Sequence, residues 1–150
     1  MRYFTEELSS KEQWESAFKR WEKSIKKIEC YFPADFIKAL LSGDLHDSYI
    51  TNFRYVSFPN STTGFAKTAD IYLELHEDCW KDKYYSLKFK NVARIKIDFV
   101  YTFTWLYAEV RRIKARKHDK TRRFALEVLG EEDNLYIEFE ELIFSSQVIE

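Results

Sequence analysis

The hydrophobic period of this chain changes once, from helical to strand-like, and the change falls at Asp44. Before Asp44, apolar residues recur at three- and four-residue spacings, as on one face of an α-helix. After it, apolar and polar residues alternate, as in strands with one buried and one exposed face. We find no internal repeat and no linker. The pattern therefore predicts one α+β domain, with a helical part over residues 1–43 and a β-rich part over residues 44–150.

Two helices are predicted before the change of period. Ser9 and Ser10 each precede a Glu or Gln by three residues, which is a doubled capping-box signal for the start of the first helix. Pro33 suits the first turn of the second helix, and Gly43 suits its end. The apolar face of the first helix consists of Trp14, Ala17, Phe18, Trp21, Ile25 and Ile28.

The β-rich part contains a series of alternating runs. Ile71, Leu73 and Leu75 alternate with more polar residues, and similar runs follow as far as residue 139. The clearest loop lies at residues 59–64, which read Pro-Asn-Ser-Thr-Thr-Gly. Short turns join most of the runs, as is typical of antiparallel strands. We therefore predict a mostly antiparallel sheet of about six strands, with the helical pair packed on it.

The near-neutral charge limits the kinds of partner. Lys and Arg number 24 and Asp and Glu number 25, so the net charge is −1. This balance excludes a globally basic nucleic-acid binder, although it leaves room for a local basic patch. Aromatic residues make up 18% of the chain, which excludes a disordered protein, because disordered chains are poor in aromatics.

Cysteine usage and the apolar segments predict a soluble, cytoplasmic protein. We expect Cys30 and Cys79 to be free, buried thiols, because a core of this size needs no disulfide. Residues 1–7 turn acidic at once and lead into no apolar segment, unlike a signal peptide. The longest strongly apolar stretch, residues 99–110, is too short to span a bilayer and carries Glu109.

The sequence lacks the motifs of the common enzyme classes. Its three glycines are far apart, so neither of the glycine-rich phosphate-binding loops, GxxxxGK[ST] and GxGxxG, occurs. The nucleophile motif GxSxG and the metal motifs CxxC and HExxH are also missing. We therefore expect no cofactor and no metal, and we nominate no catalytic residue.

The triplet His46-Asp47-Ser48 lies where helix gives way to strand and has two interpretations. With His76 and Asp78 it could supply a general base or metal ligands. Alternatively, Asp47 and Ser48 cap backbone donors at the start of a strand, which is the interpretation we favour. Because neighbouring residues of a strand point to opposite faces, we expect His46 and Asp47 not to share one ligand.

A basic segment lies between residues 111 and 123, with Asp119 as its only acid. It is either an electrostatic docking surface for an acidic protein or RNA, or a solvated hairpin tip whose charges discourage aggregation. RNA is the weaker functional option, because no aromatic residue interleaves within the segment, whereas single-strand binding normally includes stacking. The positive residues are Arg111, Arg112, Lys114, Arg116, Lys117, Lys120, Arg122 and Arg123.

Trp80 is a second candidate for partner contact. We expect Trp14 and Trp21 in the core, because they lie on the helical stripe. Trp80 instead stands among the charged residues of 77–83, so it is a candidate for the exposed aromatic anchors that interfaces favour. The predicted partner-binding residues are Arg111, Arg112, Lys114, Arg116, Lys117 and Trp80.

Several strand motifs of this chain resemble those of small bacterial families. The segments that carry the likeness are 45–50 (Leu-His-Asp-Ser-Tyr-Ile), 84–92, 105–110, 124–129 and 135–139. Their order is similar to that of families with an "LHDS" opening, an "LxFxNV" strand, a "YxEV" strand and an acidic final hairpin, some of which are grouped with immunity proteins of polymorphic toxin systems. The resemblance implies no catalytic residues. It implies an inhibitor that acts by binding.

Three functions are therefore expected in order of preference. The first is a non-enzymatic cytoplasmic protein, most concretely an immunity-type inhibitor that neutralises a toxin domain by direct binding. The second is an RNA-binding accessory protein that uses residues 111–123. The third is a small metal-dependent hydrolase around His46, Asp47 and His76. We expect no membrane contact, and an exposed sheet edge would also allow a homodimer.

Overall fold

The residues that the structure describes fold into two α-helices and nine strands, which confirms the predicted α+β class. The structure is a computed structural model and describes residues 3–4, 7–59, 66–77, 83–98, 103–114, 122–130 and 134–148. The elements are α1 (Lys11–Lys26), a short 3-10 helix η1 (Glu29–Tyr31), α2 (Ala34–Ser42), β1 (Ser48–Pro59), β2 (Ala66–His76), β3 (Lys83–Lys90), β4 (Arg94–Asp98), β5 (Thr104–Trp105), β6 (Tyr107–Ile113), β7 (Arg123–Leu129), β8 (Asn134–Phe139) and β9 (Glu141–Val148).

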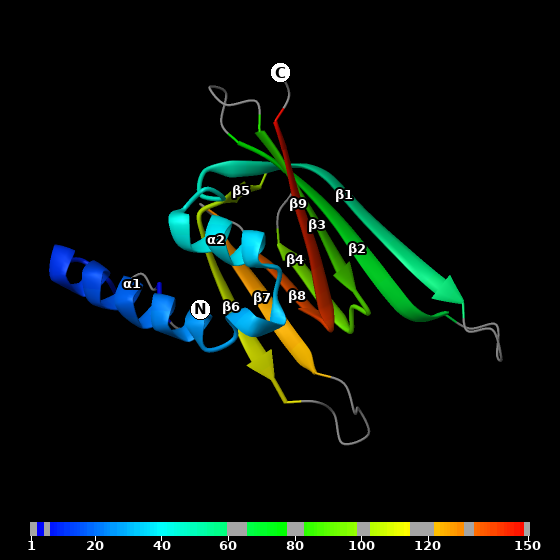
Figure 1. The fold of residues 1–150 in the computed structure, drawn as a ribbon, viewed down its shortest axis with the longest axis horizontal. Coiled ribbons are helices and arrows are strands. Elements are labelled where there is room, and N and C mark those ends of the chain that lie inside the picture. Colours follow the sequence, from blue (N-terminus) through cyan, green and yellow to red (C-terminus); the bar gives the residue numbers. More distant parts are fainter. Residues whose placement is uncertain are drawn as a thin grey trace.

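The strands form two antiparallel sheets, where the sequence predicted one sheet of about six strands. A five-stranded sheet has the order β5-β1-β2-β3-β9, and a four-stranded sheet has the order β4-β8-β7-β6. Both helices lie on the same side of this β-structure (Figure 1). The extra strand β9 escaped prediction because a single residue, Glu140, separates it from β8. Such a junction carries no turn signal in the sequence.

The two sheets meet at a corner centred on Asn91. Asn91 has φ 53°, a left-handed conformation that only asparagine, aspartate and glycine adopt readily. Its backbone N–H donates to Asp70 Oδ1 at 3.2 Å, and its side-chain amide donates to Glu140 Oε2 at 2.8 Å. These bonds fix the point at which β3 passes into β4 and β8 passes into β9.

The helix boundaries follow the predicted caps. Ser10 and Gln13 form a capping box at the start of α1, with the Gln13 backbone N–H donating to Ser10 Oγ at 3.1 Å. Pro33 precedes α2, and Gly43 ends it with φ 80°. On the predicted helical stripe, Ala17, Trp21 and Ile25 are buried and Trp14 and Ile28 are half-buried, so these residues face the core as predicted, whereas Phe18 is exposed.

Helix α1 covers the free edge of β6. The indole N–H of Trp21 donates to the backbone carbonyl of Ala108 at 2.7 Å, in a buried setting. An edge strand presents unpaired backbone groups, and this bond satisfies one of them. By contrast, β1 pairs with β5 only at Ser48 and Tyr49, so the rest of its outer edge has no strand partner among the described residues. The homodimer stays a prediction.

The cysteine prediction was wrong for Cys30. This thiol is free but exposed, because η1 turns the chain at the surface after α1. Cys79 lies outside the described residues. In the part of the chain that is described, neither helix has the length and apolar character needed to cross a membrane.

Candidate functional site

Two arginines from the β6–β7 hairpin pack on one tyrosine. The guanidinium carbon of Arg112 lies 5.7 Å from the centroid of the Tyr31 ring, and that of Arg122 lies 4.6 Å from it. Tyr31 belongs to η1 and also contacts Phe124, with ring centroids 5.5 Å apart. Phe124 is buried in the core. We call Tyr31, Arg112 and Arg122 the Tyr31 cluster.

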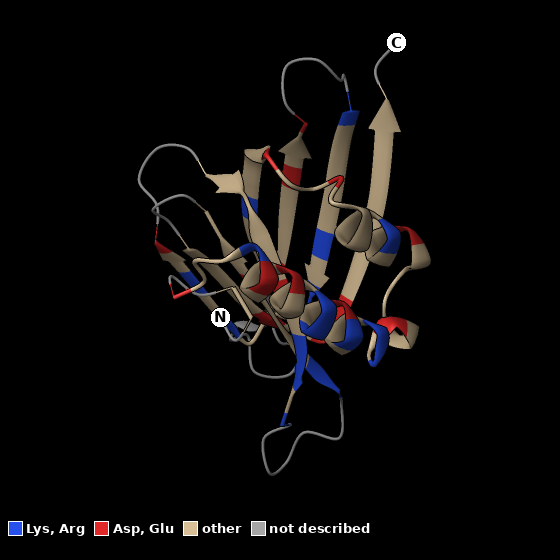
Figure 2. Ribbon diagram, turned by 90° about the vertical axis from the view of Figure 1, so that its left-hand side faces the viewer, with Lys and Arg blue, Asp and Glu red and all other residues tan. Residues whose placement is uncertain are grey.

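Further positive charge gathers around the Tyr31 cluster. The last turn of α1 carries Lys23 and Lys26, Lys27 is the C-cap of this helix, and α1 packs beside β6. Figure 2 shows the blue end of α1 next to the blue ends of the two hairpin strands. Lys26 pairs with Glu22 at 3.2 Å in an exposed ion pair, which contributes little. We call the Tyr31 cluster, Lys114 and these three lysines the basic end.

Arg111 does not belong to the basic end, although it neighbours Arg112 in the sequence. It points to the other face of the hairpin, where its guanidinium donates to Glu127 Oε2 at 3.2 Å and lies 5.8 Å from the Tyr136 ring centroid. The pKa of Glu127 is lowered: burial alone would raise it, but its interactions, including the hydrogen bond and charge of Arg111, outweigh burial.

The other predicted contact residues fall on undescribed positions. Arg116, Lys117 and Trp80 lie outside the described residues. Of the predicted set, the structure therefore brings Arg112 and Lys114 to the basic end and separates Arg111 from it. Sequence reasoning missed Tyr31, because nothing in the spacing of residues links η1 to a hairpin some eighty residues further along the chain.

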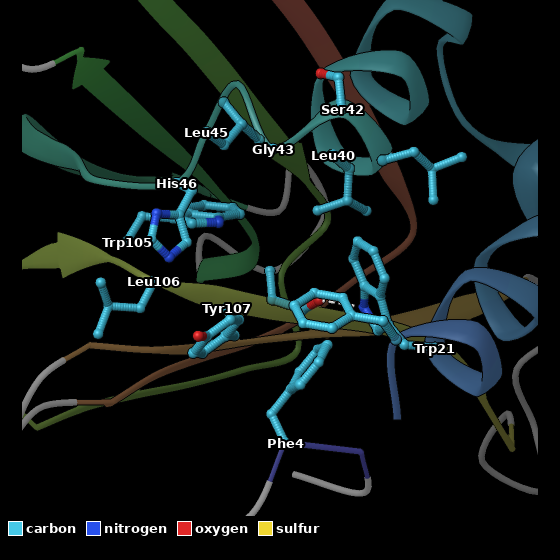
Figure 3. Close-up of a pocket in the computed structure, with 13 residues that line it drawn as sticks. Phe4, Trp21, Leu40, Ser42, Gly43, Leu45, His46, Trp105, Leu106 and Tyr107 are labelled. Atoms are coloured by element: carbon cyan, nitrogen blue, oxygen red, sulfur yellow. Dashed lines mark hydrogen bonds between the residues drawn. The ribbon is translucent and has the colours of Figure 1, made fainter. Parts of the chain in front are cut away.

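A pocket of about 390 Å³ lies between α1, the end of α2 and the start of β6. Its walls are mostly apolar and include five Phe, Trp or Tyr rings, some of which contact one another: the Phe4 centroid lies 4.7 Å from that of Tyr107 and 5.7 Å from that of Trp21. Figure 3 shows Trp21 at one side of this aromatic pocket and Trp105, Leu106 and His46 at the other. Pockets of this volume are typical of small-molecule sites.

His46 lies at the rim of the aromatic pocket in a conformation set by Asp47. The imidazole Nδ1 lies 3.1 Å from Asp47 Oδ2, and the ring faces Tyr107 with centroids 5.5 Å apart. Asp47 has φ 65°, and its backbone N–H donates to the Trp105 carbonyl at 2.8 Å.

The reason given for expecting His46 and Asp47 not to share one ligand, that they are neighbours in a strand, was therefore wrong. The strand begins only at Ser48, and Asp47 is left-handed rather than extended. The capping interpretation was wrong for Ser48 as well. Its hydroxyl donates to the carbonyl of Leu45 at 2.5 Å, so it satisfies a backbone acceptor and not a donor.

His76 lies apart from His46 and Asp47. Its Nδ1 is hydrogen-bonded to the hydroxyl of Tyr49 at 2.5 Å, and its ring stacks on Tyr84 with centroids 4.2 Å apart. Among the described residues, no group of three or more His, Cys, Asp or Glu side chains could hold a metal ion. His46, Asp47 and His76 thus do not form the predicted metal site, and Asp78 lies outside the described residues.

A buried polar pair at the end of β2 was missed by sequence reasoning. Tyr85 donates its hydroxyl to Glu77 Oε1 at 2.5 Å, and both side chains are buried. Burial, followed by the hydrogen bond and charge of Glu77, raises the pKa of Tyr85 well above its ordinary value. A signal existed, since Glu77 continues the buried face of Ile71, Leu73 and Leu75.

Comparisons with known proteins identify no family for this chain. No protein-family model matches the chain, and a search of curated proteins also found no match. The resemblance to "LHDS" and immunity-type families stays a prediction.

Proposed function

We propose that this is a non-enzymatic binding protein, an immunity-type inhibitor that neutralises a toxin-like protein by occluding it with the basic end. One observation carries the proposal: Arg112 and Arg122 are both held on the ring of Tyr31, at 5.7 and 4.6 Å. Neither arginine forms an ion pair with a described residue. Their charge is therefore available to a partner.

Fixing the two guanidinium groups favours binding. An arginine side chain carries about 2 kcal/mol of rotamer entropy, part of which a free side chain loses on binding. Packing on Tyr31 removes part of that freedom beforehand. The N–H edges of a stacked guanidinium still donate two parallel bonds to a carboxylate. The basic end thus suits an acidic protein surface, with an association rate that falls as salt rises.

The position of Tyr31 favours a protein over RNA. Single-strand binding uses aromatic rings whose faces are free to stack on bases. The Tyr31 ring already contacts Arg112, Arg122 and Phe124. An aromatic residue therefore does stand within the basic surface, but its ring already packs against these neighbours.

The proposal is tested by a pull-down with charge-matched variants. The tagged chain is incubated with bacterial lysate at low and high salt, and eluates are examined by mass spectrometry and a nucleic-acid stain. Arg112→Glu/Arg122→Glu should lose a stoichiometric acidic partner at low salt, whereas Arg94→Glu/Lys96→Glu, on exposed positions of β4, should retain it. The partner's activity should fall when the wild-type chain is added.

Two results would contradict the proposal. Equal retention by both double variants would show that the basic end is not the contact surface. Recovery of RNA with no protein would instead support the RNA-binding alternative, in which the basic end contacts RNA. Thermal melting of both variants checks that each is folded.

A further inference from the structure

The aromatic pocket combines apolar walls with one oriented imidazole. Ten of the residues that line it are apolar or aromatic, and no Lys, Arg, Asp or Glu is among its described lining residues. The indole N–H of Trp21 is already bonded to the Ala108 carbonyl, so this side chain offers the pocket its apolar ring. An ionic ligand would lose its hydration here without gaining a counter-charge. The walls therefore select a neutral, ring-shaped ligand.

The contact with Asp47 decides what His46 offers to such a ligand. A carboxylate can only accept, so Asp47 Oδ2, 3.1 Å from Nδ1, favours the tautomer that has its proton on Nδ1. In the neutral imidazole, Nε2 is then an acceptor. No described residue bonds to Nε2. The ring is partly open, with 41% of its side-chain surface exposed at the rim.

The backbone holds this arrangement in place. Asp47 has φ 65°, and its N–H is anchored to Trp105, which is itself buried and lines the pocket. Aspartate tolerates this conformation at a cost, and such conformations cluster at ligand sites. The His46 N–H donates to the Gly43 carbonyl at 3.0 Å, so the imidazole is carried by a tight turn.

We infer that the aromatic pocket binds a small neutral aromatic compound with one hydroxyl or ring N–H donor, and that His46 Nε2 accepts the hydrogen bond from that donor. Phenols and indoles are the chemical class. The ring of the ligand lies against the apolar walls of the pocket, and its donor faces His46 at the rim. This site is separate from the basic end and does not depend on the proposed function.

The test compares indole with 1-methylindole, which has the same ring system but no N–H. Binding to the full chain is measured by calorimetry and by ligand-observed NMR. Indole should bind with a dissociation constant on the order of 0.1 mM, within the limits of ligand efficiency. It should bind about five- to tenfold more tightly than 1-methylindole, which is the effect of one hydrogen bond.

Three variants locate the site. His46→Phe should abolish the preference for indole while leaving binding of 1-methylindole, whereas His76→Phe, at a histidine that does not line the pocket, should keep the preference. Leu106→Trp, which enlarges a lining side chain between β5 and β6, should abolish binding of both compounds, with a thermal melt to show that the variant is folded.

Three results would overturn the inference. The first is no binding of indole at millimolar concentrations. The second is equal affinity for the two compounds, and the third is a preference that survives in His46→Phe. Indole could fail to bind while a protein partner quenches the fluorescence of Trp21 and Trp105. That result would show that the pocket binds a side chain of the partner instead.

Discussion

The arginines on the two faces of the β6–β7 hairpin lie in different surroundings. On the outer face Arg111 pairs with Glu127, and Arg123 lies 3.6 Å from Glu140. On the helix side Arg112 and Arg122 pack on Tyr31 and form no ion pair with a described residue. Strand alternation sends neighbouring arginines to different surroundings, and those surroundings decide whether a charge supports the fold or remains available for binding.

The pair of Glu77 and Tyr85 buries a carboxyl group that has a hydrogen bond from Tyr85 on one of its two oxygens, and it should show the largest effect. Tyr85→Phe removes the hydrogen bond and leaves the Glu77 carboxylate buried. We expect the free energy of unfolding to fall by about 2 kcal/mol at neutral pH, measured by urea denaturation. Tyr84→Phe, on the other face of β3, should cost less than about 0.5 kcal/mol. Equal losses would mean that the pair is not a stabilising contact.

The same pair should make stability depend on alkaline pH. The pKa of Tyr85 is raised in the folded protein, so the protonated phenol stabilises the fold. That stabilisation is complete below the ordinary pKa of 10.0 and is lost as the pH rises above it. Wild type should therefore lose up to about 1.4 kcal/mol more per pH unit than Tyr85→Phe above this value. Parallel curves for the two proteins would refute the assignment.

Charge reversal on the hairpin should separate its two faces. Arg111→Glu places a carboxylate beside Glu127 in a partly buried site, and we expect a loss of about 2 kcal/mol in the free energy of unfolding. Arg112→Glu makes the same charge change on the helix side, where it removes one exposed contact with the Tyr31 ring, and should lower that free energy by no more than about 1 kcal/mol. Urea denaturation of the two variants checks this difference. A larger loss of stability for Arg112→Glu than for Arg111→Glu would contradict this difference between the two faces.

The smallest effect should come from the acidic partner of Arg111. The pKa of Glu127 is lowered, so its stabilising contribution is present above its ordinary pKa of 4.5 and is lost as the pH falls below that value. Glu127→Gln should therefore show a shallower loss of stability in acid than wild type, when unfolding midpoints are measured at neutral pH and at about pH 3.5. Glu22→Gln, in an exposed pair, is the control and should behave like wild type.

Local signals predicted the helical part well and the β-rich part only coarsely. The capping box, Pro33 and Gly43 act on their immediate neighbours, so the spacing of residues located the helix ends. The corner at Asn91 depends on Asp70 and Glu140, which are distant in the sequence, and no periodicity encodes it. Strand alternation sends Arg111 and Arg112 to opposite faces, but the prediction placed both in one contact surface because they are neighbours in the sequence.

The candidate sites were harder to predict than the fold, because they combine residues that are distant in the sequence. Charge density located the basic segment, but not the contact with Tyr31 that fixes two of its arginines. The triplet at 46–48 was conspicuous in the sequence, and a single left-handed residue, Asp47, decided how its side chains are arranged. The aromatic pocket draws on residues as far apart as Phe4 and Ala108, so no local pattern could indicate it.

The bond between Trp21 and Ala108 also has a consequence for biosynthesis. Its two residues are 87 positions apart, so the ribosome makes α1 well before the strand edge on which it docks. At roughly 5–20 residues per second, the apolar stripe of α1 waits several seconds without its partner. During that interval the nascent chain exposes Trp14 and Phe18 as well as Trp21. We therefore expect chains released before β6 is complete to aggregate or to be held by chaperones.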